Sequence, residues 1–125
     1  MDRLTVLIVE DERISRNALR KLLAASGYQP AAFESAEDAL RDMADRMPSV
    51  ALFDVDLPGM SGLDLARRLE QLRPDMIKVL ITAAEGDRIE NFRKEHDVHY
   101  IPKPLDFSRL LRLLGDPPVP LRGDC

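Results

Sequence analysis

Short apolar runs alternate along the chain with longer segments in which apolar residues recur every three or four positions. The short runs are typical of buried strands, and the longer segments have the period of amphipathic helices. The predicted strands are residues 4–9, 29–33, 50–53, 77–81 and 99–101. The predicted helices are residues 13–25, a segment from Ser35 through Met43, a segment between Gly62 and Pro74, residues 87–94 and residues 106–114.

The apolar positions of a helix predict the face that it buries. The positions expected to face the core are Ile14, Ala18, Leu19 and Leu22 in the first helix and Leu65, Ala66, Leu69 and Leu72 in the third. Ser35, with Asp38 three residues later, is typical of a helix start. Gly27 and Gly115 are placed to end the first and last helices.

Five strand–helix units in one chain predict an α/β fold of the (βα)5 type, with a doubly wound parallel sheet. Right-handed crossovers place helices on both faces of such a sheet. The periodic pattern stops after Leu114, and residues 115–125 contain three prolines and no period. We therefore expect one domain over residues 1–114, followed by a proline-rich tail or the start of a linker.

The composition fits one globular domain and argues against several classes of function. The chain has 125 residues, 45% of them hydrophobic, and its 18 basic and 22 acidic residues give a formal net charge of −4. This acidic balance argues against direct binding of nucleic acid, which needs a basic face. Cys125 is the only cysteine, and no apolar run suits a signal peptide or a membrane span. We expect a cytoplasmic protein with no membrane partner.

Reactive side chains lie where four of the predicted strands end. They are Glu10 and Asp11 after the first strand, Asp54 after the third, Thr82 at the fourth and Lys103 after the fifth. Because open parallel sheets bind ligands outside the carboxyl ends of their strands, we expect these side chains to lie together. Three neighbouring carboxylates repel one another unless a cation lies between them, and oxygen ligands alone favour Mg²⁺. Lys103 adds a fixed positive charge that suits a phosphoryl oxygen.

Each of these residues also has an ordinary explanation. An acidic residue at a strand end is often a solvated group or a helix cap, and Asp11 could cap the first helix. Thr82 could be a plain strand residue. Five compatible residues at successive strand ends outweigh these separate explanations.

Four segments of the sequence resemble the receiver domain of two-component response regulators. They are LIVEDE at 7–12, FDVDLPGMSGLDL at 53–65, ITA at 81–83 and YIPKP at 100–104. The segment that begins at Phe53 is highly specific, whereas ITA alone is weak. The resemblance extends from about residue 4 to residue 114. It implies a flavodoxin-like fold with strand order 2-1-3-4-5.

The resemblance implies a phosphorylation switch rather than an enzyme with steady turnover. Asp54 then accepts a phosphoryl group from a sensor histidine kinase or a histidine phosphotransfer protein, with Mg²⁺ as the cofactor. Lys103, the Thr82 hydroxyl and the Ala83 amide contact the phosphoryl oxygens. The implied Mg²⁺ ligands are the carboxylates of Asp11 and Asp54, the backbone carbonyl of Asp56, and Glu10 either directly or through water.

The resemblance also implies how the signal leaves this site. Phosphate draws Thr82 inward, Tyr100 enters the vacated space, and the face made by the fourth helix, fifth strand and last helix changes shape. Tyr100 could instead be a strand aromatic that packs on a helix. The family pattern further implies a cis Lys103–Pro104 bond and admits a phosphorylation-dependent homodimer. A basic stripe on the first helix is either a solvated face or a kinase-docking surface, and it consists of Arg13, Arg16, Arg20 and Lys21.

Two other functions fit parts of the same pattern. Asp54-Val-Asp56 resembles the Asp-x-Asp pair of haloacid-dehalogenase-like phosphatases, in which the second acid protonates the leaving group. The next residue, Leu57, departs from that pattern, and the acidic pair Glu10-Asp11 precedes the nucleophile instead of following it. The other alternative is a pseudo-receiver, an interaction module that keeps the fold without phosphorylation.

Overall fold

Five parallel strands form a single sheet in the computed structural model, which describes residues 4–43, 45, 47–84 and 86–115. The strands are β1 (Thr5–Val9), β2 (Gln29–Phe33), β3 (Val50–Phe53), β4 (Ile77–Thr82) and β5 (His99–Pro102). Their order across the sheet is β2-β1-β3-β4-β5, which confirms the expected order. Each predicted strand is present within one residue of its predicted bounds.

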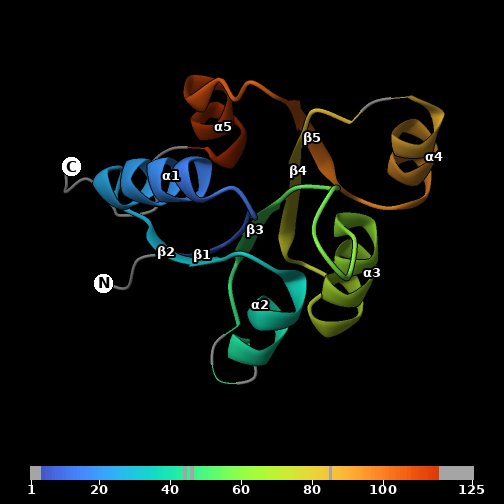
Figure 1. Ribbon diagram of the computed structural model, residues 1–125, viewed down its shortest axis with the longest axis horizontal. Helices are drawn as coiled ribbons and strands as arrows, with labels where there is room; N and C mark the ends of the chain where they lie inside the picture. Colours follow the sequence, from blue (N-terminus) through green and yellow to red (C-terminus); the bar gives the residue numbers. More distant parts are fainter. Residues whose placement is uncertain (1–3, 44, 46, 85, 116–125) are drawn as a thin grey trace.

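Five helices connect the strands and cover both faces of the sheet, as an α/β fold of the (βα)5 type requires. They are α1 (Arg13–Ala25), α2 (Ala36–Asp42), α3 (Gly62–Leu72), α4 (Asp87–Glu95) and α5 (Phe107–Leu114). Figure 1 shows α1 and α5 on one face, with α2, α3 and α4 on the other. Gly27 after α1 and Gly115 after α5 have φ values of 98° and 88°, which agrees with their predicted role at helix ends.

Two further expectations concern membrane-spanning helices and the end of the chain. The described part of the chain contains no helix that is both long enough and apolar enough to span a membrane. Apart from Gly115, the expected proline-rich tail lies outside the described residues.

The register of the sheet brings the functional strand ends side by side. Val9 of β1 pairs with Phe53 of β3, and Thr82 of β4 pairs with Pro102 of β5. All four residues of β3 are buried, because this strand has neighbours on both sides and helices cover both faces. The residues that follow β1, β3 and β5 therefore meet at one edge of the sheet.

The buried face of α1 differs from the prediction. Leu19 is buried as expected, but Ile14 is 75% exposed, Leu22 is 44% exposed and Ala18 is also exposed. Leu23 is the second buried residue of the helix instead. The helix carries apolar residues on two adjacent stripes, and periodicity alone does not decide which stripe meets the sheet. Leu19 and Leu23, four positions apart, define the stripe that does.

The end of α3 also differs from the prediction. Leu65, Ala66 and Leu69 are buried as expected, whereas Leu72 is 48% exposed. Leu72 is the last residue of the helix. The buried stripe of α3 instead begins earlier than predicted, at Leu63, which is 4% exposed.

Side-chain caps fix the starts of the helices near the sheet edge. Ser35 Oγ accepts the Asp38 amide at 3.1 Å, as its spacing predicted. The cap of α1 is Glu12, whose Oε1 accepts the Ser15 amide at 3.0 Å. Asp11 therefore does not cap α1, and its carboxylate is not committed to the helix start.

Candidate functional site

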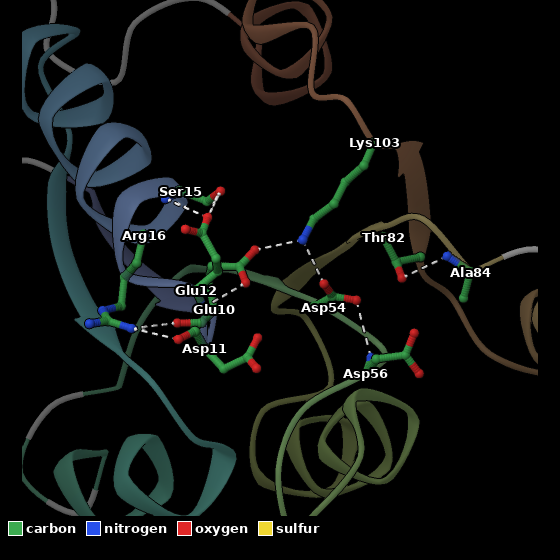
Figure 2. A network of polar contacts seen from close by, with 10 residues as sticks. All are labelled: Glu10, Asp11, Glu12, Ser15, Arg16, Asp54, Asp56, Thr82, Ala84 and Lys103. Carbon is green, nitrogen blue, oxygen red and sulfur yellow. Dashed lines mark hydrogen bonds and ion pairs between the residues drawn. The ribbon is translucent and has the colours of Figure 1, made fainter.

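Lys103 lies between two buried carboxylates at the carboxyl edge of the sheet (Figure 2). Its Nζ donates to Oε1 of Glu10 at 2.7 Å and to Oδ2 of Asp54 at 2.7 Å. Glu10 directly follows β1, Asp54 directly follows β3 and Lys103 directly follows β5. The predicted convergence of these strand ends is therefore present in the fold.

Asp54 is ionised although it is only 8% exposed. Burial alone raises the pKa of this carboxyl, but hydrogen bonds from Lys103, from the Thr82 hydroxyl and from the Asp56 amide outweigh burial and hold the pKa below its usual value. The Asp56 amide reaches Oδ1 at 3.1 Å. A charged and partly desolvated carboxylate of this kind is a candidate nucleophile.

The two carboxylates in turn keep Lys103 charged. Burial lowers the pKa of Lys103, yet the hydrogen bonds and negative charges of Asp54 and Glu10 raise it above the usual value. The Lys103–Pro104 bond is cis, as the family pattern implied. Lys103 thus supplies a permanent positive charge at the sheet edge.

The loop between β1 and α1 is held by bonds to its own backbone. Glu10, 7% exposed, accepts the Glu12 amide on Oε2 at 3.1 Å. Arg16 Nη1 donates to the carbonyl of Glu10 at 2.9 Å and to that of Asp11 at 3.3 Å. Figure 2 shows the guanidinium of Arg16 against these two carbonyls, on the side of the loop away from Lys103. Arg16 is therefore not only a solvated basic residue of α1, because its guanidinium holds the loop that carries Glu10 and Asp11.

Thr82 connects the site to the loop after β4. It is fully buried, its Oγ1 accepts the Ala84 amide at 3.1 Å, and its hydroxyl hydrogen-bonds with the Asp54 carboxylate. Ala83, whose amide was expected to face a phosphoryl oxygen, is exposed directly beside Thr82. The end of β4 is thus in contact with the candidate nucleophile.

Asp11 and Asp56 are exposed at the same edge. Within the described ranges, no three side chains among His, Cys, Asp and Glu form a group that could hold a metal ion. Glu10 and Asp54 point to the ammonium of Lys103 instead.

The chemistry of these donors nevertheless fits Mg²⁺. Glu10 and Asp54 contact one ammonium, Asp11 and Asp56 are exposed at the same edge, and every donor among them is a hard oxygen atom. Residues that could hold the ion are Asp11, Asp54, Glu10 and, through its backbone carbonyl, Asp56.

Tyr100 joins β5 to the loop that follows Thr82. Its hydroxyl donates to the Ala84 carbonyl at 3.3 Å, and the Arg93 guanidinium lies 5.5 Å from the centre of its ring. The side chain is half-buried. Asp54, Thr82, Ala84 and Tyr100 therefore form a continuous series of contacts from the sheet edge to the β5 surface.

An apolar groove of about 300 Å³ lies beside Lys103. It runs between α1 and the segment that joins β5 to α5, and its lining includes Ala18, Leu22, Leu105 and Phe107. The apolar stripe of α1 that periodicity placed in the core thus borders an open groove next to the site.

Sequence reasoning missed two residues that shape the site. Arg16 bonds the β1–α1 loop, and Glu37 of α2 accepts the Met60 amide of the β3–α3 loop at 2.9 Å. Both side chains bond backbone groups, which leave no mark in the pattern of residue types. Glu37 lies in the first turn of α2, where an acidic residue is favourable in its own right, so its position gave no signal of a second role.

Comparison with known proteins agrees with this arrangement. The family model of the response regulator receiver domain matches residues 6–114. The DNA-binding transcriptional regulator NtrC of Escherichia coli is 30% identical over 115 residues, which are 91% of this chain and 24% of NtrC. The two-component response regulator PhoP of Pseudomonas aeruginosa is 36% identical over 108 residues, which are 84% of this chain and 47% of PhoP. The chain thus spans less than half the length of these relatives.

Solved structures agree with the family match. The crystal structure of a CheY-like response regulator receiver domain protein from Methanospirillum hungatei is 28% identical and has a TM-score of 0.84. The match covers 90% of this chain and 91% of that one. The chain belongs to the response regulator receiver domain family of two-component systems.

Proposed function

We propose that the chain is a phosphorylation-dependent signalling switch that accepts a phosphoryl group on Asp54. The donor in this proposal is a phosphohistidine on a sensor histidine kinase or a histidine phosphotransfer protein of the cytoplasm. The observation that carries the proposal is the buried, ionised Asp54 carboxylate with the Lys103 ammonium at 2.7 Å. That pair supplies both a nucleophile and a fixed positive charge for the group that is transferred.

The transfer forms one bond and breaks one. An Asp54 carboxylate oxygen forms a bond to phosphorus, the phosphorus–nitrogen bond to the donor imidazole breaks, and the imidazole keeps that electron pair. Lys103 then contacts a phosphoryl oxygen, and the Thr82 hydroxyl and Ala83 amide contact the others. Mg²⁺, which the Asp11 and Asp54 carboxylates, the Asp56 carbonyl and Glu10 would hold, offsets negative charge on the transferred group.

The groove beside Lys103 supports partner docking on the α1 side of the site. Ile14 and Leu22 are exposed apolar residues of α1, and Leu22 lines the groove. A partner helix that packed there would bring its phosphohistidine to the same sheet edge as Asp54. The basic residues of α1 add charge for a partner with an acidic surface.

The contacts of Thr82 and Tyr100 support an output through the α4–β5–α5 face. In this proposal a phosphoryl group on Asp54 takes the Thr82 hydroxyl, the loop that holds Ala84 shifts, and Tyr100 changes its packing. In this proposal residues 1–114 form the receiver domain, and residues 115–125 are a proline-rich tail or the start of a linker. The proposal admits a phosphorylation-dependent homodimer and does not fix which surface pairs.

Labelling with acetyl phosphate and Mg²⁺ tests the proposal against a phosphatase. We expect one phosphoryl group per chain, stable in acid and labile in alkali, and no label on Asp54→Asn. Steady turnover of a small phosphomonoester would favour the haloacid-dehalogenase-like alternative. Absence of any difference between wild type and Asp54→Asn would favour a pseudo-receiver.

A further inference from the structure

The loop between β3 and α3 is anchored by a side chain from α2. Glu37 Oε2 accepts the Met60 amide at 2.9 Å, across 23 positions in the sequence. The other side-chain hydrogen bonds at this loop come from its own residues, Asp54 and Ser61. Among the described residues, Glu37 is the one side chain from another element that hydrogen-bonds the loop backbone. The Met60 amide holds the pKa of Glu37 below its usual value, so the acceptor is ionised at neutral pH.

Gly59 shows how closely this carboxylate approaches the loop. A Cβ atom at Gly59 would lie 2.5 Å from Glu37 Oε2, and the residue has a φ of 72°. Glycine is the residue that satisfies both conditions without strain. The loop backbone therefore lies close to the Glu37 carboxylate at two consecutive residues, Gly59 and Met60.

The anchored loop carries two groups of the proposed phosphorylation site. It begins at Asp54, whose Oδ1 accepts the Asp56 amide at 3.1 Å, and it includes the Asp56 carbonyl. Its far end packs back on Asp54, because a Cβ atom at Gly62 would lie 1.9 Å from the Asp54 carbonyl oxygen. A shift of the loop at Met60 would therefore move Asp56 relative to Asp54.

We propose that Glu37 is a positioning residue for Mg²⁺ binding and phosphorylation at Asp54, acting through the Met60 amide. This inference rests on the proposed function. Glu37 itself does not touch the reacting atoms. It fixes the loop so that the Asp56 carbonyl stays at the sheet edge, in the way that outer contacts orient metal ligands in other proteins.

Three substitutions of Glu37 separate the effect of side-chain length from the effect of charge. Glu37→Ala removes the acceptor, and Glu37→Asp keeps the charge but shortens the side chain by one carbon. Glu37→Gln keeps an oxygen acceptor at full length and loses the charge. Asp38→Ala is the matched control, because Asp38 is an acid in the same first turn of α2 and its side chain bonds Arg41 rather than the loop.

Four measurements report on the anchor, the site and the fold. Hydrogen exchange of the Met60 amide in metal-free protein reports the bond itself, and urea unfolding reports global stability. Calorimetric titration with Mg²⁺ gives the dissociation constant, and labelling by acetyl phosphate gives the rate at Asp54.

We expect Glu37→Ala and Glu37→Asp to exchange the Met60 amide faster and to weaken Mg²⁺ binding about tenfold, with a matching loss of labelling rate. Glu37→Gln and Asp38→Ala should stay within about twofold of wild type in Mg²⁺ affinity. If Glu37→Ala does not fold, the Glu37→Asp and Glu37→Gln pair gives the same comparison.

Unchanged Mg²⁺ affinity and labelling in Glu37→Asp would overturn the inference, as would equal losses in Asp38→Ala. So would a loss that follows the unfolding free energy alone, because it would assign Glu37 a merely structural role. Wild type that takes no label from acetyl phosphate would instead overturn the proposed function, and the inference with it.

Discussion

Lys103 balances the charge of two carboxylates that are each 10% exposed in their side chains. Replacing it with Met leaves Glu10 and Asp54 buried without their cation, and breaking a buried ion pair from one side is strongly destabilising. We predict that Lys103→Met lowers the free energy of unfolding by about 3 kcal/mol in metal-free buffer, measured by urea unfolding. Lys21→Met, an exposed change on α1, should stay within about 0.5 kcal/mol of wild type. Equal effects of the two changes would contradict the charge balance described for Lys103.

The lowered pKa of Asp54 predicts a pH dependence with a definite sign. Its pKa in the folded chain lies below the ordinary value of 3.8, so the stability that its charge contributes is present above 3.8 and is lost as the pH falls through the lower, folded pKa. Urea unfolding in EDTA should therefore show the stability of wild type falling relative to Asp54→Asn as the pH drops below about 4. If the stability of wild type instead rises relative to Asp54→Asn as the pH drops, burial, which raises the pKa of Asp54, dominates.

The chemistry of single residues was predictable where a strand end fixed the position. Glu10, Asp54, Thr82 and Lys103 lie together because parallel strands end at one edge, a rule that needs only the strand bounds. The role of Glu37 was not predictable in this way. Its partner is a backbone amide 23 positions away, and the path of the β3–α3 loop that brings them together is not encoded in a local pattern.

The orientation of α1 can be tested with two neighbouring leucines. Leu23 is fully buried, whereas Leu22 is 44% exposed beside the groove. We predict that Leu23→Ala lowers the free energy of unfolding by about 3 kcal/mol, and that Leu22→Ala lowers it by less than about 1 kcal/mol. Urea unfolding of both variants measures this directly. A larger loss of unfolding free energy in Leu22→Ala than in Leu23→Ala would favour the orientation of α1 that periodicity predicted.

The helices show where a sequence pattern reaches its limit. Helix bounds followed from caps and glycines, such as Ser35 before α2 and Gly115 after α5. The buried face of α1 did not follow, because its apolar residues occupy two stripes and the choice between them depends on packing against β1 and β2. The stripe left outside holds Ile14, Ala18 and Leu22, and of these Ala18 and Leu22 line the groove beside Lys103. The wrong prediction therefore fell on a surface that the proposed function uses.

The molecule as a whole links its sheet edge to one outer face through β4 and β5. Tyr100 and Tyr28 are the two tyrosines of the chain, and Tyr28 is buried in the apolar core that Leu19 and Leu23 of α1 share. We predict that beryllofluoride with Mg²⁺ shifts the NMR signals of the Tyr100 ring and leaves those of Tyr28 in place, because the Tyr100 hydroxyl contacts Ala84. Asp54→Asn should show neither shift. Identical Tyr100 signals with and without beryllofluoride would remove Tyr100 from the switch.

The α/β architecture was predictable as a whole because strand and helix periods alternate five times and parallel sheets allow few connections between them. The proposed function depends on Asp54. Mass spectrometry of the intact chain after acetyl phosphate and Mg²⁺, followed by peptide mapping, is the most direct test. One added phosphoryl group that maps to Asp54, is absent in Asp54→Asn and is suppressed by EDTA is the predicted result. A group on any other residue, or an unchanged mass for wild type, would contradict the assignment of Asp54 as the phosphoryl acceptor.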